Sequence, residues 1–137
     1  MNGVPCTYRI SVKAITRDSD GRVLLGREHN GSWELPGGGL EYGENPKEGL
    51  AREVSEETGF AVDWISDQPV AFWTINKEVG SPTIKWFAFV AYEVNVSGEF
   101  KPNPDANDEV EELRYVSREE VRSLKLPDNS KPYFLGT

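Results

Sequence analysis

The segment that most constrains the fold is residues 45–58, NPKEGLAREVSEET, because both of its ends carry helix-end signals. Asn45 is a favourable N-cap, Pro46 suits the first helical position, and Glu48 completes an arrangement that is similar to a capping box. Gly59 follows as a typical C-terminal stop. The sequence therefore predicts one helix with well-defined ends over residues 45–58.

Strand patterns lie on both sides of this helix. Before it, residues 7–17 and 22–28 are rich in β-branched and aliphatic residues and are separated by the turn DSDG, which predicts a hairpin over 7–28. After the helix, strands are predicted over 60–66, 69–76, 83–96 and 110–116. Ser117 is expected to cap a final helix over 118–124, followed by an irregular tail docked by Tyr133 and Phe134. This order indicates one α+β domain over residues 1–137, layered as an α/β/α sandwich with a mixed sheet.

Charge and composition limit the kinds of partner. The net charge is −8 and Lys and Arg do not cluster, which argues against a DNA-binding surface. No apolar run is long enough for a membrane span, and the first ten residues do not resemble a secretion signal, so we expect cytoplasmic residence. A small phosphorylated ligand is compatible with the charge, provided that a cation lies between the two negative partners.

Three glutamates, Glu53, Glu56 and Glu57, fall on one face of the predicted helix within an arc of roughly 100°. At the spacings where helical side chains meet, the only cation is Arg52, next to Glu56. A solvated acidic face is one explanation, although such faces usually include Lys. A divalent cation is the other, because carboxylate oxygens suit Mg²⁺ or Mn²⁺. The preceding segment, LPGGGLEYGE, is rich in glycine, so its backbone can approach whatever the acids hold.

Residues 38–60, GGLEYGENPKEGLAREVSEETGF, resemble the Nudix box, Gly-x5-Glu-x7-Arg-Glu-U-x-Glu-Glu-x-Gly-U, where U is bulky and apolar. Nine specified positions agree in register: Gly38, Glu44, Arg52, Glu53, Val54, Glu56, Glu57, Gly59 and Phe60. The chain is identified as a member of the Nudix (MutT-like) hydrolase family, and the likeness extends more loosely over most of the chain. The resemblance implies the Nudix fold, with the box as a loop and helix and with a C-terminal helix.

The resemblance also implies an activity. Nudix enzymes use water and a divalent metal to hydrolyse a pyrophosphate bond in a nucleoside diphosphate linked to another group. By this resemblance Glu53, Glu56 and Glu57 are the metal-binding carboxylates, and Glu53 is also a candidate for deprotonating the water. Gly38 is expected to offer its backbone carbonyl to the metal, Mg²⁺ or Mn²⁺, and Arg52 to orient a glutamate.

Acids near the box and outside it have less definite roles. Glu44 is expected to anchor the loop or to join the metal shell. Because the family often supplies a further acid from outside the box, Glu109 is the first candidate and Glu112 the second. A solvated acidic loop explains either residue about as well.

The substrate beyond its diphosphate is left open between a nucleoside triphosphate and a nucleotide sugar such as ADP-ribose. Arg27, Trp33 and Trp86 are the candidate substrate-binding residues, although aromatic residues in strands more often belong to the core. The alternative function is a Nudix-fold module that binds a nucleotide without cleaving it. The family varies in oligomeric state, and a homodimer is one of the states that it allows.

Overall fold

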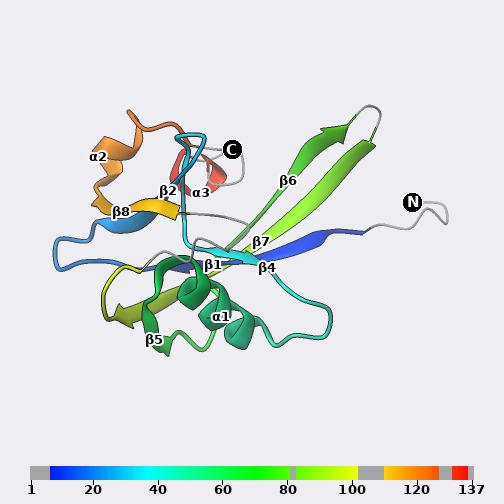
Figure 1. Ribbon diagram of the computed structural model, residues 1–137. Helices are drawn as coiled ribbons and strands as arrows, with labels where there is room; N and C mark the ends of the chain where they lie inside the picture. Colours follow the sequence, from blue (N-terminus) through cyan, green and yellow to red (C-terminus); the bar gives the residue numbers. More distant parts are fainter. Residues whose placement is uncertain (1–6, 81–82, 102–109, 127–130, 136–137) are drawn as a thin grey trace.

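The structure is a computed structural model that describes residues 7–80, 83–101, 110–126 and 131–135 (Figure 1). A larger sheet has the strand order β4-β1-β7-β5, with β6 also paired to β7, and a smaller sheet has the order β3-β2-β8. The strands are β1 (Arg9–Ile15), β2 (Val23–Glu28), β3 (Trp33–Glu34), β4 (Gly37–Gly39), β5 (Ala61–Ile65), β6 (Ala71–Gly80), β7 (Thr83–Ser97) and β8 (Val110–Val116). The helices are α1 (Pro46–Thr58), α2 (Arg118–Val121) and α3 (Lys131–Leu135). Within these residues, no helix is long and apolar enough to cross a membrane.

Strand β7 organises the larger sheet. It runs parallel to β1 and antiparallel to β5 and β6, so the sheet is mixed. Its two faces are both buried: Phe89 and Ala91 face one hydrophobic cluster, and Tyr92 and Val94 face another. This agrees with the apolar residues on both faces of the predicted strand 83–96.

The predicted hairpin over 7–28 is wrong except at its turn. The Asp18 carboxylate accepts hydrogen bonds from the backbone of Asp20 and Arg22, which closes the turn, and one bridge joins Arg17 to Val23. Beyond that bridge the two strands separate, since β1 pairs with β4 and β7 whereas β2 pairs with β3 and β8. Partners distant in sequence therefore replace the local pairing.

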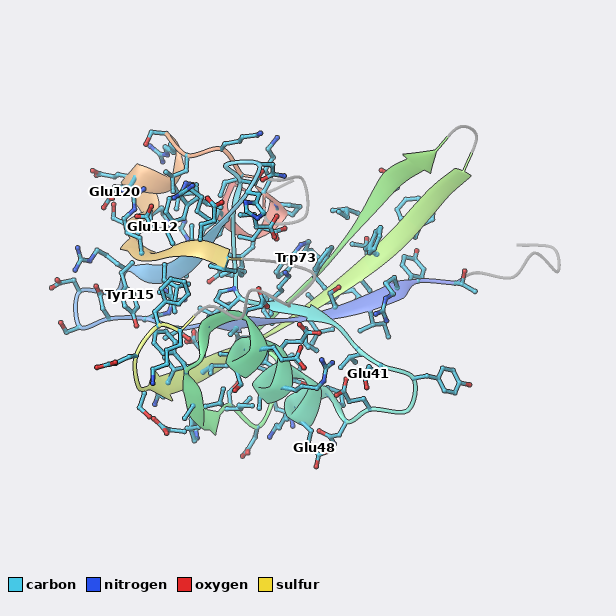
Figure 2. All side chains as sticks on the ribbon, viewed as in Figure 1. Glu41, Glu48, Trp73, Glu112, Tyr115 and Glu120 are labelled. Carbon is cyan, nitrogen blue, oxygen red and sulfur yellow. The ribbon has the colours of Figure 1, made fainter. Side chains whose placement is uncertain are left out.

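Helix α1 has the predicted ends. The Asn45 side chain accepts hydrogen bonds from the backbone N–H groups of Lys47 and Glu48, and Gly59 adopts the left-handed conformation with a φ of 78°. Figure 2 shows Glu48 at the solvent side of the helix, and it is exposed. The opposite side buries Leu50 and Val54 against the larger sheet, which fixes the direction of the acidic face.

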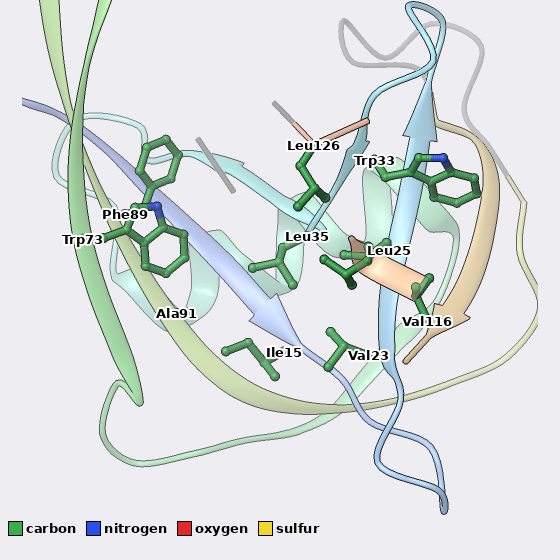
Figure 3. Close-up of a cluster of buried hydrophobic side chains, with 11 residues drawn as sticks. Ile15, Val23, Leu25, Trp33, Leu35, Trp73, Phe89, Ala91, Val116 and Leu126 are labelled. Atoms are coloured by element: carbon green, nitrogen blue, oxygen red, sulfur yellow. The ribbon is translucent and has the colours of Figure 1, made fainter. Parts of the chain in front are cut away.

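The main core lies between the two sheets (Figure 3). It includes Ile15 from β1, Leu25 from β2, Val116 from β8 and the stacked pair Trp73 and Phe89, whose ring centroids are 5.5 Å apart. The second cluster lies between the larger sheet and α1. Hydrophobic clusters on both faces of the larger sheet hold the layers together.

Two further segments differ from the sequence-based expectation. Residues 37–39 form strand β4 because their backbone pairs with β1, although three consecutive glycines predict irregular structure. The tail contains the short helix α3, from which Tyr133 packs against Trp73 at a centroid distance of 5.7 Å. The predicted docking by Tyr133 is confirmed, while the predicted irregular conformation of its segment is wrong.

Candidate active site

Arg52 is the centre of a partly buried ionic network on the side of α1 that faces strand β4. Its guanidinium forms a bidentate pair with Glu44, with Nε 2.8 Å from Oε2 and Nη2 3.0 Å from Oε1. Its Nη1 also donates to Glu53 at 3.2 Å and to Glu56 at 3.3 Å. The sequence-based count gave Glu53 no cationic neighbour; that count was wrong, because it omitted the adjacent residue, Arg52. The arginine therefore positions two of the three helix carboxylates at once.

The glycine-rich strand β4 lies directly against the same carboxylates. The backbone N–H of Gly37 donates to Oε1 of Glu57 at 2.9 Å, and the Glu57 side chain is buried. A Cβ atom added to Gly38 would be 2.6 Å from Oε2 of Glu53, so only glycine allows this approach. The fold thus brings together Gly38, Glu53 and Glu57, three of the residues that the sequence predicts for the site.

The arrangement of the acids limits how a metal could be held. Within the described ranges, no three Asp, Glu, His or Cys side chains are close enough to one another to form a ready-made metal site. Mg²⁺ does not require such a site, because it commonly keeps several waters and binds one or two carboxylates together with substrate phosphates. The Glu53 carboxylate, which lies against Gly38, and the Glu57 carboxylate, which lines the cavity, suit this mode of binding by their chemistry.

Glu44 anchors the loop to the helix. Its carboxylate also accepts the backbone N–H of Glu41 at 3.0 Å. The hydrogen bonds from Arg52, helped by that backbone N–H, lower the pKa of Glu44 from its ordinary value of 4.5 to about 2. Of the two predicted roles for Glu44, the geometry favours loop anchoring.

This pKa shift predicts a pH dependence of stability. Because the folded-state pKa of Glu44 is below its unfolded value, its contribution is present above about pH 4.5 and is lost as the pH falls toward 2. The variant Glu44→Gln should be less stable than wild type at pH 7, and the difference between the two free energies of unfolding should shrink between pH 5 and pH 3. Urea denaturation across this range measures it. Glu48→Gln, at an exposed position on the same helix, is the control, and a wild-type–E44Q difference that is constant with pH would contradict the assignment.

A cavity of about 630 Å³ lies between the two sheets, beside strand β4 and the Glu57 side chain of α1. Gly37, Gly38 and Glu57 form one part of its wall, and Ile75, Phe87 and Phe89 form an apolar part. The volume is in the range of small-molecule sites. Of the α1 carboxylates, Glu57 lines this space, which is large enough to hold a ligand.

The predicted substrate-binding residues do not line this cavity. Trp33 is buried in the core, and the guanidinium carbon of Arg114 is 4.7 Å from its ring centroid. Trp86 is 44% exposed and contacts Tyr8. Arg27 forms ion pairs with carboxylates of β8. The geometry does not support these three residues as the substrate contacts.

The two candidate acids outside the box also differ in position. Glu109 lies outside the described residues. Glu112 is on β8, where it pairs with Nε of Arg27 at 3.3 Å, and Figure 2 places it on the side of β8 and α2. It does not line the cavity.

The sequence analysis missed most of the cavity lining, including three lysines, Lys13, Lys125 and Lys131. Lys13 lies in the middle of β1, is only 5% exposed and lines the cavity. For Lys13 the signal was present in the sequence, because a lysine interrupts the mostly apolar stretch ISVKAI at a position that is buried in the structure.

Comparisons with known proteins agree with this geometry. The family model described as the NUDIX domain matches residues 7–135. A MutT-like protein from Streptomyces ambofaciens is 50% identical over 60 residues, which are 43% of this chain and 39% of that protein. An RNA pyrophosphohydrolase from Bartonella clarridgeiae is 29% identical over an alignment of 139 positions, and the alignment covers 85% of this chain and 80% of that protein. The crystal structure of MutT protein from Methanosarcina mazei Go1 has 30% identity and a TM-score of 0.67, covering 96% of this chain and 94% of that chain.

The loop and helix that carry the Nudix-box residues lie beside a cavity between two sheets. This arrangement is that of the Nudix hydrolases. The chain belongs to the NUDIX domain family. The predicted family and the predicted α+β Nudix fold are thereby confirmed.

Proposed function

We propose that this chain is a divalent-metal-dependent pyrophosphohydrolase, in which residues 1–137 act as one Nudix hydrolase domain. The reaction is hydrolysis of the pyrophosphate bond in a nucleoside diphosphate linked to another moiety: water attacks one phosphorus, the bridging P–O bond breaks, and the other phosphate group leaves with its substituent. The observation that supports the proposal most is the close approach of the Glu53 carboxylate to Gly38, beside the buried Glu57, with Gly38 and Glu57 both lining the cavity.

From the sequence, the proposed metal ligands are carboxylate oxygens of Glu53, Glu56 and Glu57 and the backbone carbonyl of Gly38. Since these three carboxylates do not form one ready-made cluster in the described structure, at most two of them would bind any one ion together with waters and substrate phosphates. The proposed ligands are hard oxygen donors, which suit Mg²⁺ or Mn²⁺, and the Nudix family generally uses divalent metals. When bound, such an ion neutralises phosphate charge, polarises phosphorus–oxygen bonds and lowers the pKa of water. It also explains how a chain with a net charge of −8 binds a polyanion.

The protein's own groups have positioning roles around this centre. Arg52 holds Glu53 and Glu56 by charge-assisted hydrogen bonds, and the backbone of Gly37 holds Glu57. Glu53 is the candidate base for the attacking water. Glu109 is kept as the proposed assisting acid from the sequence alone.

The proposed substrate is a nucleoside triphosphate or a nucleotide sugar such as ADP-ribose. The similarity to an RNA pyrophosphohydrolase over 85% of the chain adds RNA as a substrate to test. The strongly negative net charge favours a small nucleotide over a long phosphate backbone.

The test is a phosphate and pyrophosphate release assay with Mg²⁺ across nucleoside triphosphates, nucleotide sugars, dinucleoside polyphosphates, 5′-triphosphate RNA and capped RNA. We expect turnover of at least one class and its loss when the metal is chelated. Binding of nucleotide and metal without turnover of any substrate would support the alternative, a non-catalytic Nudix-fold module.

A further inference from the structure

Lys13 is a buried cation that the box does not explain. It lies on β1 directly opposite Gly37 in the antiparallel pairing with β4. Ser11 and Ile15 share its side of the strand, whereas Val12 and Ala14 pack toward α1. Lys13 therefore points into the space between the two sheets, and it lines the cavity there.

The protein provides Lys13 with little compensation for its burial. An ammonium has three donors, and the structure shows one hydrogen bond, 3.3 Å long, from Nζ to the backbone carbonyl of Leu35. Nζ is also 6.0 Å from the centroid of the Phe89 ring. Among the described residues these are the contacts that the structure records for Nζ, and neither is to a carboxylate, although Glu28, Glu34 and Glu57 line the same cavity. Because a buried charge is costly unless it is paired, a ligand in the cavity is the natural partner.

The position of Lys13 indicates which chemical group of the ligand would lie next to its ammonium. On one side is Gly37, whose backbone holds Glu57 of the proposed metal site, and on the other side is the ring of Phe89. A nucleotide that spans the cavity has its phosphates near the glycines and the carboxylates, and an apolar wall of Phe87 and Phe89 beyond them. We infer that Lys13 donates to a phosphoryl oxygen of the substrate and positions the diphosphate; this inference rests on the proposed function.

A purely structural role predicts different behaviour. If Lys13 served only to hold Leu35, replacing it with methionine would lower the melting temperature and leave anion binding unchanged. If Lys13 binds phosphate, Lys13→Met removes an unpaired buried charge, so the ligand-free protein should melt at the same or a higher temperature. The variant should also lose most of the stabilisation by the anion.

The experiment measures binding of inorganic pyrophosphate by calorimetry, with Mg²⁺ present and with Mg²⁺ chelated. The proteins are wild type, Lys13→Met, Lys13→Arg and the control Lys47→Met, an exposed-side lysine of α1 that does not line the cavity. We expect the Kd of Lys13→Met to rise about ten- to hundredfold, as for loss of a charged hydrogen bond, and Lys47→Met to match wild type. Lys13→Arg keeps the charge and should bind more tightly than Lys13→Met. Equal Kd values in wild type and Lys13→Met, or no pyrophosphate binding by wild type, would overturn the inference.

Turnover separates this inference from the proposed function. If wild type hydrolyses a substrate and Lys13→Met has an unchanged KM, hydrolysis stands and the role of Lys13 is wrong. If pyrophosphate binding depends on Lys13 but no substrate in the panel is hydrolysed, the anion site stands and the proposed hydrolase activity is wrong. Should Lys13→Met fail to fold, Lys13→Gln provides a second neutral variant for the same measurements.

Discussion

Glu56→Gln is expected to reduce turnover at least about a hundredfold while leaving the fold intact. The Glu56 side chain is 49% exposed, and its contact in the structure is with Arg52 on the preceding turn. Its replacement by an amide of the same shape therefore removes a charge without opening a cavity, and stability should change by no more than about 0.5 kcal/mol. Changes to groups that merely support metal ligands typically cost 10–100-fold, and a direct ligand should cost at least as much. Turnover in the release assay and thermal melting measure the two effects.

The matched control for this prediction is Glu48→Gln, which removes the same charge from an exposed position on the same helix. Glu48 lies two turns before Glu56 and outside the Arg52 network, so Glu48→Gln should turn over substrate at the wild-type rate. If Glu56→Gln were as active as Glu48→Gln, Glu56 would not be a metal ligand.

Gly38→Ala is expected to reduce turnover about 10–100-fold with a small effect on folding. The new methyl group would approach the whole Glu53 carboxyl group, at 2.6 Å from Oε2, 2.7 Å from Cδ and 3.0 Å from Oε1. Gly38 is not among the glycines with positive φ, so alanine causes no backbone strain and the side chain of Glu53 must move instead. A displacement of about 1 Å at a reacting centre is enough for a loss of this size. The measurements are turnover and the Mg²⁺ concentration for half-maximal rate, which should rise.

Gly39→Ala is the neighbouring control in the same strand. Its methyl group would meet the guanidinium of Arg9, an exposed side chain that can rotate away from the strand, and it would not meet Glu53. We expect a much smaller loss of turnover than in Gly38→Ala. Equal losses in the two variants would mean that the strand, and not the glutamate contact, is what matters.

The parts of the fold that the sequence predicts well are those set by neighbouring residues. The start and end of α1 depend on Asn45 and Gly59, which act on backbone groups within a few residues of themselves. Strand β8 was predicted as residues 110–116 and has those bounds. In both cases the signal and the structure lie in the same short segment.

The parts that the sequence does not predict depend on distant partners. Strand β4 forms from Gly37–Gly39 only because β1 offers a free edge to their backbone. The hairpin over 7–28 opens because β7, some seventy residues later, pairs with β1. A local pattern has no information about either partner.

The candidate site shows the same division. The box residues Gly38, Glu53 and Glu57 were predicted and lie together, since they share one loop and one helix. The cavity wall is assembled from several strands, so Lys13 was missed. For Trp33, the same tertiary packing placed a predicted contact in the core.

The central place of β7 has a consequence for amide hydrogen exchange. Residues 88–93 of β7 have β1 along one edge and lie mainly beside β6 along the other, with buried clusters on both faces. Their backbone N–H groups cannot reach solvent through fraying of a sheet edge, so their slowest exchange should require opening of the whole domain. Exchange at these amides therefore reports the global free energy of unfolding under native conditions. The measurement needs neither denaturant nor a substrate.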